Sequence, residues 1–510
     1  MLPYLSEVQN ASKKYSVVFR GVNYGEGAQD GEFAETYNLS TDQYPCITQR
    51  AARVKVKEYA NPTTIHSKGQ LLVIDGTDVY YGGAKVGEVT AGKKQTATIG
   101  NYIVIFPDKK YYKVPTEDDQ DGTFGSMEEE YKASGLKFTA SAISKEGANF
   151  PFREGDAVTI TGCSSNGNNK KAEIIIRGAS SDELTFDDNA FTEATEEGEV
   201  TIKRSVPDLD FICESNYRLW GTHGNTIYSS KFSDPLNFKV FDGLANDSYA
   251  IEVGSEGEFT GCIPYSSHIC FFKENTLHKL YGTKPSNFQI TTVNVYGVQS
   301  GSEGSMQIVN EQLLYKGVGG VYAYTGGVPE LISEKFGNKR YSEAVACCDG
   351  EKYYISMKQG DTWSMFAYDV MKNIWLREDD THAVDMTFYD GKVYFIDTNG
   401  LYYIDKTADR RDIEWGATFC TMHETMNERK GYSKFHLRMD LSAGAWLAVD
   451  IKTENDLQWR QVYSTHNEKA KTISIPIMPT RCDSIDIRLR GKGICTIKAF
   501  VREFTVGSDV

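Results

Sequence analysis

The stretch that decides the fold class is residues 386–406, MTFYDGKVYFIDTNGLYYIDK. Asp390-Gly391 and Asn399-Gly400 are residue pairs that readily adopt the positive-φ conformations of tight hairpin turns. Val393 and Phe395 between them alternate with other side chains, which is the period of two expected of a half-buried strand. The stretch therefore predicts three consecutive short antiparallel strands.

The same pattern recurs along the chain: a polar turn, a short apolar run, a second turn and a strand containing tyrosine. The later repeats begin near residues 215, 266, 310, 350 and 390. Their spacing of roughly 40 to 50 residues is typical of the four-stranded blade of a β-propeller. Two earlier repeats, at Gly69 and Gly100, lie closer together, so they are either hairpins of one blade or two blades. We predict a propeller of roughly five to seven blades, with a large β-sandwich as the alternative.

Composition agrees with an all-β protein and limits its function. The chain has 46 Gly and 31 Tyr but only 13 Pro, and it has almost no amphipathic helical period. With 55 Lys and Arg against 70 Asp and Glu, the net charge of −15 disfavours a general nucleic-acid binder. No apolar stretch reaches the ~18 residues of a membrane span, and the start lacks the basic-then-apolar order of a secretory signal. We therefore expect folding in the cytoplasm.

Five segments differ in pattern. Residues 1–60 are predicted to be an N-terminal arm leading into the propeller, whose two parts are residues 61–115 and 206–408. Residues 116–205 interrupt the repeats with five short strand-like runs, which predicts a small closed β-barrel inserted in a propeller loop. Residues 409–510 carry longer alternating strands and predict a C-terminal β-sandwich.

No motif specific to an enzyme is present. His423-Glu424 lacks a second histidine four residues on, so the zinc-protease motif fails. Gly25, Gly27 and Gly31 lack the Lys-Ser/Thr that follows in a phosphate-binding loop. The cysteines are scattered without a C-x-x-C pair and are expected to be reduced and mostly buried. We predict a protein that is not an enzyme and that binds no cofactor.

The best ion-binding candidate is the acidic stretch TEDDQDGTFGSMEEE that begins at Thr116. Calcium prefers six to eight oxygen ligands, and a tight glycine turn at Gly122 could gather the carboxylates. Against a calcium loop, the first position is Glu and no flanking helices are indicated, so an acidic solvated linker is the favoured interpretation. The candidate ligands are Glu117, Asp119, Asp121, Thr123 and Glu128.

Basic residues gather in the predicted C-terminal sandwich, against the acidic average of the chain. They predict either an ordinary solvated face or a docking surface for an acidic partner subunit. The candidate docking residues are Arg429, Lys430, Lys434, Arg481, Arg488, Arg490 and Lys492.

Several phrases carry a resemblance to a known family. They are FRGVN (19–23) with DGEFAETYNLSTDQYP (30–45), LWGTHGNTIYSSKFSDPLNF (219–238) and GGVYAYTGGVPELIS (319–333). They resemble the β-propeller tail proteins of tailed bacteriophages, of the nozzle or tail-stabilisation kind. In that family a Gly-Asn turn leads to Ile-Tyr-x-Ser and then to Asp-Pro-x-Asn-Phe. The resemblance spans the arm and the propeller and implies an architecture without a catalytic site.

The resemblance implies a virion structural protein, made in the bacterial cytoplasm and located in the phage tail. Such a protein would form a ring at the nozzle, hub or tip, with a hexamer favoured. It would contribute to the DNA conduit without specific nucleic-acid binding and would dock other tail proteins. The alternatives are a tail module that binds host-surface glycans or another receptor and, less favoured, a propeller glycosidase with a carboxylate pair.

Overall fold

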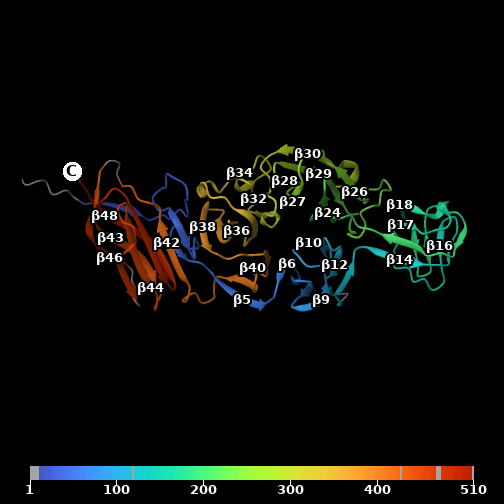
Figure 1. Ribbon diagram of the computed structural model, residues 1–510, viewed down its shortest axis with the longest axis horizontal. Coiled ribbons are helices and arrows are strands. Elements are labelled where there is room, and N and C mark those ends of the chain that lie inside the picture. The colour runs from blue at the N-terminus through green and yellow to red at the C-terminus, as the bar shows by residue number, and fades with distance from the viewer. Residues whose placement is uncertain (1–10, 118–119, 425–427, 467–471, 508–510) are drawn as a thin grey trace, which may run out of the picture. The chain divides into compact units, whose positions relative to one another are not determined.

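The computed structural model describes residues 11–117, 120–424, 428–466 and 472–507. Within these ranges the regular elements are strands and four short 3-10 helices (Figure 1), so the all-β prediction is confirmed. Among the described residues no helix is long and apolar enough to cross a membrane. The chain forms two compact units: one joins the sequence up to Ala60 with that from Gly304 onward, and the other spans Asn61–Glu303.

The Asn61–Glu303 unit contains antiparallel four-stranded sheets that follow the sequence repeats. The first two comprise β6 (Pro62–Lys68), β7 (Gln70–Asp75), β8 (Asp78–Tyr81) and β9 (Ala84–Glu88), then β10 (Gln95–Ile99), β11 (Tyr102–Phe106), β12 (Lys110–Lys113) and β13 (Thr123–Ser126). The next two comprise β23 (Phe211–Ser215), β24 (Arg218–His223), β25 (Thr226–Ser229) and β26 (Tyr249–Glu252), then β27 (Phe259–Tyr265), β28 (His268–Lys273), β29 (Thr276–Tyr281) and β30 (Gln289–Asn294). The repeats at Gly69 and Gly100 therefore belong to two separate sheets rather than to one.

Neighbouring sheets of this unit pack face to face. Ile103 and Ile105 of β11 share one apolar cluster with Leu72 of β7, whereas Val104 on the opposite face of β11 packs with Leu219 of β24. Successive side chains of a strand point to opposite faces. A strand covered on both faces is therefore apolar throughout, which explains the sequence YIVIF of β11.

The other unit contains three further four-stranded sheets within its described residues. Two comprise β31 (Gln307–Val309), β32 (Gln312–Gly317), β33 (Gly320–Tyr324) and β34 (Glu330–Leu331), then β35 (Ser342–Cys348), β36 (Lys352–Gln359), β37 (Thr362–Asp369) and β38 (Ile374–Asp379). The third comprises β39 (Asp385–Tyr389), β40 (Lys392–Asp397), β41 (Gly400–Asp405) and the early strand β5 (Ala52–Glu58).

The three strands predicted from residues 386–406 are confirmed as β39, β40 and β41, and Asp390 and Gly391 form their first turn with φ of 46° and 73°. Gly400 lies in β41 rather than in the second turn. A Cβ at Gly400 would lie 2.3 Å from the carbonyl oxygen of Lys57, so glycine is required there by the close approach of β5.

The insertion differs from the predicted five-stranded closed barrel. Over residues 129–204, all described, it has nine short strands in two sheets that enclose one apolar core, with Leu136 and Ile143 from one sheet and Val158 and Ile202 from the other. Several strands have only two or three residues, too short for a period of two to reveal them in the sequence. The sheets are β14 (Glu129–Ala133), β22 (Val200–Arg204), β17 (Ala157–Thr161) and β18 (Lys170–Ile175), and β19 (Gly178–Ala179), β20 (Glu183–Thr185), β16 (Ala142–Ser144), β15 (Leu136–Phe138) and β21 (Ala194–Glu196).

The C-terminal region is a two-sheet β-sandwich that includes strands from the N-terminal region. The six-stranded sheet comprises β1 (Ser12–Ser16), β3 (Leu39–Ser40), β4 (Ile47–Gln49), β48 (Cys495–Val506), β43 (Lys430–Leu441) and β46 (Thr472–Cys482). The five-stranded sheet comprises β2 (Phe33–Tyr37), β42 (Glu414–Phe419), β47 (Ile485–Lys492), β44 (Trp446–Thr453) and β45 (Arg460–His466).

The predicted N-terminal arm is therefore corrected: its blue strands pair with orange and red strands of the sandwich in Figure 1. The reason is apolar burial, because Phe33, Leu39 and Ile47 belong to the same core as the C-terminal strands. The 3-10 helices are Asn166–Asn168, Pro285–Asn287, Glu303–Ser305 and Glu334–Phe336.

Candidate functional site

The loop after β25 contains the sequence Ser-Asp-Pro-Leu-Asn-Phe at residues 233–238, and hydrogen bonds within this segment stabilise a turn. Asp234 Oδ1 accepts a hydrogen bond of 3.1 Å from the backbone N–H of Leu236, the pattern in which an aspartate stabilises its own turn. Asn237 Nδ2 donates to the other carboxylate oxygen of Asp234 at 2.7 Å. These bonds hold the amide of Asn237 in a single orientation.

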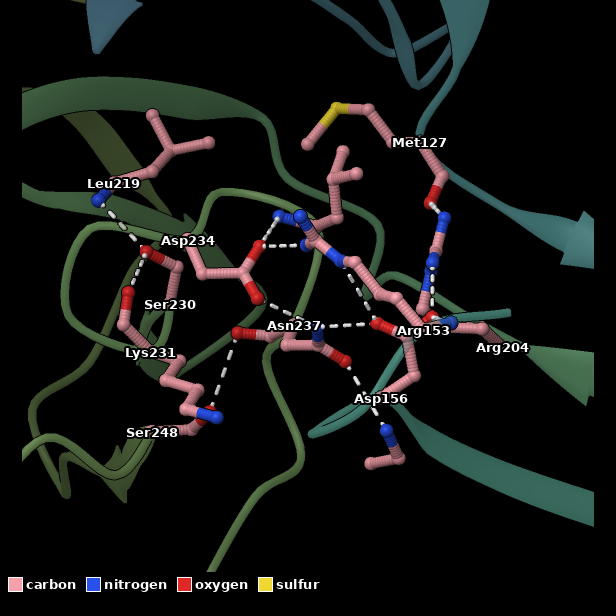
Figure 2. Close-up of polar contacts among 12 residues, drawn as sticks. Met127, Arg153, Asp156, Arg204, Leu219, Ser230, Lys231, Asp234, Asn237 and Ser248 are labelled. Atoms are coloured by element: carbon pink, nitrogen blue, oxygen red, sulfur yellow. Dashed lines mark hydrogen bonds and ion pairs between the residues drawn. The ribbon is translucent and has the colours of Figure 1, made fainter. Parts of the chain in front are cut away.

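The side-chain amide of Asn237 forms hydrogen bonds with the inserted domain at Asp156 (Figure 2). Asn237 Nδ2 donates to Asp156 Oδ1 at 2.9 Å, and Asn237 Oδ1 accepts from the backbone N–H of Ala157 at 3.1 Å. Asp156 is completely buried, and Arg204 of β22 donates to its Oδ2 at 2.6 Å. Arg153 donates hydrogen bonds to both carboxylates. Its Nε donates to Asp156 at 3.3 Å, and its Nη2 donates to Asp234.

We call this cluster of Arg153, Asp156, Arg204, Asp234 and Asn237 the polar joint. It contains two carboxylates and two guanidinium groups, so its formal charges balance. Burial lowers the pKa of Arg153, but Asp234 and Asp156 raise it, and the net shift is upward. Removing one partner from a buried ion pair leaves an uncompensated charge and typically costs about 3–5 kcal/mol. The polar joint therefore fixes the insertion to the loop of the β23–β26 sheet.

A second set of ion pairs links the same two elements nearer the surface. Arg177 of the insertion contacts Asp242 at 2.6 Å, and Lys239 contacts Glu173 of the insertion at 2.5 Å. Within the insertion, Arg177 also contacts Asp187 at 2.9 Å. These residues border a groove of about 570 Å³ between β18 and residues 239–242. The exposed pairs contribute less stability than the polar joint, because water screens them.

The predicted calcium ligands are not brought together in the described residues. Asp119 lies outside the described residues, and Glu117 and Asp121 are both exposed. Thr123 begins the extended strand β13, whereas a calcium loop would turn back on itself there. Glu128 is ion-paired with Lys109 at 3.0 Å. Within the described ranges no group of three or more His, Cys, Asp or Glu side chains could hold a metal ion.

The predicted docking residues form two separate clusters on the sandwich. At one end of β43, Lys430 is buried against Asp483 at 3.1 Å and Arg429 contacts Glu454 at 2.9 Å. Arg481 is exposed opposite Gly431, and Lys434 is half-buried further along the strand. These contacts reduce the charge available to a partner.

The second cluster lies on the outer face of β47, where Arg488, Arg490 and Lys492 alternate with buried residues. Arg488 Nε and Arg490 Nε donate to the same oxygen of the buried Asp450, at 3.0 and 2.7 Å. Trp459 packs over the Arg488 guanidinium with 4.5 Å between that group and the ring centroid. Lys492 is ion-paired with Asp412 at 3.1 Å. Arg488 and Arg490 share the single anion Asp450, so these three residues keep a net positive charge.

Several residues of these clusters were not among the predicted site residues. Asp450 stands between the apolar Val449 and Ile451, so a period of two places it on the outer face with the arginines, and that signal was available. Asp156 and Arg204 carry no comparable signal, because their partners come from distant segments.

Comparisons with known proteins do not identify a family. No family model matches the sequence, and no curated protein matches it. Among solved structures, the chain is similar to the phage phi92 endosialidase, with 11% identity, a TM-score of 0.27 and 70% of each chain covered. It is also similar to the N-terminal domain of Nup159, with 9% identity, a TM-score of 0.25 and coverage of 76% of this chain and 98% of that one.

A third similar structure is the β-propeller domain of Nup133 from Vanderwaltozyma polyspora, with 11% identity and a TM-score of 0.23. It covers 72% of this chain and 99% of that one. TM-scores this low carry no argument about function, so the function of this protein has to be inferred from its own residues.

Proposed function

We propose that the protein is a structural component of the tail of a tailed bacteriophage, in a ring at the nozzle, hub or tip. There it contributes to the DNA conduit and docks other tail proteins. The observation that carries the proposal is the role of the phrase at residues 233–238. This phrase resembles the Asp-Pro-x-Asn-Phe phrase of phage tail proteins, and its Asp234 and Asn237 anchor the insertion. A phrase that resembles one of that family therefore has a structural role in this chain.

We further propose that the four-stranded sheets outside the insertion, seven in the described part of the chain, are propeller blades. The strand order supports this. β5 immediately precedes β6, the first strand of the first sheet, yet it pairs with β41 and completes the last sheet of the repeat. In a ring of blades the last blade lies beside the first. A strand from the start of the repeats that completes the last blade, as β5 does, joins the two.

The charge on the outer face of the sandwich supports a docking role. The cluster of Arg488, Arg490 and Asp450 is held rigidly by shared hydrogen bonds and retains a positive charge. A carboxylate on a neighbouring tail protein would complete the pairing of both guanidinium groups. We expect the protein to assemble as a homo-oligomeric ring, with a hexamer favoured.

The experiment has two parts. Mass spectrometry of purified phage particles should detect the chain, and light scattering with negative-stain imaging should show a ring when it is mixed with the other tail proteins. Absence from the particle would overturn the proposal. So would a monomer that remains alone in the presence of every tail protein.

A further inference from the structure

An open pocket of about 330 Å³ lies at one end of the β23–β26 and β27–β30 sheets. Its polar lining comes from three places in the chain. Ser215 and Asn216 stand at the turn between β23 and β24, Ser266 and Ser267 form the turn between β27 and β28, and Thr283 follows β29. All five side chains are uncharged hydroxyl or amide groups, which both donate and accept hydrogen bonds. Loops held by rigid sheets are the usual location of binding residues.

The apolar wall of the pocket is fixed in place. Trp220 and Phe288 both line it, and their rings meet edge to face with centroids 5.1 Å apart. Trp220 Nε1 donates to the carbonyl of Ser215 at 3.3 Å, and its ring also contacts Phe271 at 6.3 Å. Trp220 is only 2% exposed, so it holds the half-buried Phe288 in place, and Phe288 provides the accessible aromatic ring. The pocket therefore combines one rigid aromatic ring with hydroxyl groups that can rotate.

The pocket is almost without charge, in a chain of which 25% of residues are charged. Arg218 is the one Lys, Arg, Asp or Glu in its lining. That side chain is only 1% exposed, and its terminal nitrogens donate to the carbonyls of Ser230 at 2.9 Å and Ala245 at 2.8 Å. Its Nε is buried and has no hydrogen-bond partner among the described residues. Burial lowers the pKa of His268, the other titratable lining group, so it is neutral at neutral pH.

We propose that this pocket binds a neutral hexopyranose, as a unit of a larger glycan. A pyranose ring presents hydroxyl groups that match the serine, threonine and asparagine side chains and an apolar face that packs against the half-buried ring of Phe288. A volume of about 330 Å³ lies in the lower part of the range for ligand sites. The lining contains no Asp or Glu, whereas glycoside hydrolysis typically uses two carboxylates. The pocket therefore binds the sugar without cleaving it, and this inference does not depend on the place of the protein in a virion.

The test uses the full chain and saturation-transfer NMR with the methyl glycosides of glucose, galactose, mannose and N-acetylglucosamine. We expect at least one of them to bind. Ser267→Tyr, which fills the pocket, should weaken that binding at least tenfold. Ser286→Tyr is the matched control, because Ser286 is an exposed serine close by in the 3-10 helix Pro285–Asn287 and does not line the pocket.

Several outcomes would overturn the inference. These are the absence of binding by all four glycosides, equal binding by the two tyrosine variants, and tighter binding of sialic acid than of any neutral sugar. Should Ser267→Tyr fail to fold, Asn216→Gly removes one hydrogen-bonding side chain from an exposed turn without adding volume, because glycine accepts the φ of 52° at this position. It should then weaken binding severalfold while the circular dichroism spectrum stays unchanged.

Discussion

Asp156 shows how one side chain can decide the placement of a whole inserted domain. Its two carboxylate oxygens accept hydrogen bonds from Arg153, Arg204 and Asn237, which come from the insertion and from the loop after β25. The carboxylate is fully buried, so water cannot replace a lost partner. The energetic consequence at this residue should therefore be large.

We predict that Asp156→Ala lowers the free energy of local unfolding of the insertion by about 3–5 kcal/mol, because it leaves Arg204 buried and unpaired. Hydrogen exchange of β17 and β22, followed by mass spectrometry, measures this loss. Asp187→Ala is the control, since the Asp187 side chain is 70% exposed in its pair with Arg177. It should cost no more than about 1 kcal/mol. Equal losses in the two variants would contradict a special role for the polar joint.

His278 is a second residue with a measurable consequence. It is almost completely buried, with Nε2 2.8 Å from Ser255 Oγ and Nδ1 2.9 Å from Thr292 Oγ1. Burial, followed by the charge of Lys273, lowers its pKa from 6.5 to about 4. The unfolded chain therefore binds the proton more readily than the folded one in that pH window.

We predict that the β27–β30 sheet loses stability as the pH falls from 6.5 toward 4. Above pH 6.5 the imidazole of His278 is neutral in both the folded and the unfolded chain, so its titration costs no stability there. The slope from this one group is at most about 1.4 kcal/mol per pH unit. An NMR titration of the imidazole should give a midpoint near pH 4 in the folded protein. A midpoint near 6.5, or an unchanged slope of local stability in His278→Gln, would contradict the prediction.

At the scale of elements, β2 shows why the N-terminal region belongs to the sandwich. Phe33 is completely buried, and its ring lies 4.9 Å from that of Phe419 and 5.7 Å from that of Phe19. Tyr37 of the same strand is 38% exposed. The strand thus contributes both to the core and to the outer face of the five-stranded sheet.

We predict that Phe33→Ala lowers the free energy of unfolding of the sandwich by about 3–5 kcal/mol, because it removes a buried ring and leaves a cavity. Tyr37→Ala in the same strand should cost much less, since its ring is partly in water. Urea unfolding monitored by the fluorescence of the sandwich tryptophans compares the two. Similar costs would show that β2 does not contribute to the core as described.

The strand β46 is an edge strand of 11 residues, and it pairs with β43 on one side. Long edges invite pairing with other chains, and proline blunts them because it has no N–H to donate. Pro476 stands opposite Lys434 in this strand, and its ring is exposed.

We predict that Pro476→Val increases self-association, because it restores a backbone donor to the open edge. Static light scattering over a concentration series measures this change. Ser474→Val is the control, since it adds the same exposed side chain to β46 where the N–H already exists. Equal association in both variants would assign the effect to surface hydrophobicity instead.

At the scale of the whole molecule, the insertion is a separate module with its own core. Its first strand β14 pairs with its last strand β22, Glu129 opposite Arg204, so its two ends lie side by side. Such a segment can be removed while the chain on either side of it stays in place, because the two points of attachment are adjacent.

We predict that replacing residues 129–204 by a short Gly-Ser linker leaves the remaining sheets folded. Far-ultraviolet circular dichroism and limited proteolysis should show an intact β protein. The loop at residues 233–238 should become more sensitive to protease, because Asn237 loses Asp156 as a partner. Global unfolding of the shortened chain would show that the insertion is required for the host to fold.

Local patterns along the sequence predict the all-β class, the recurring short strands, the two hairpins of residues 386–406, an insertion and a C-terminal sandwich. These follow from turn pairs and from a period of two, which are local properties of neighbouring residues. Which strands complete which sheet, and which polar groups come into contact, is apparent only in the folded chain. Thr48 donates to the carbonyl of Cys495, 447 positions away, and Asn237 meets Asp156 across 81 positions. Such contacts form because apolar side chains far apart in the chain are buried together, and the polar groups carried with them must then find partners away from water.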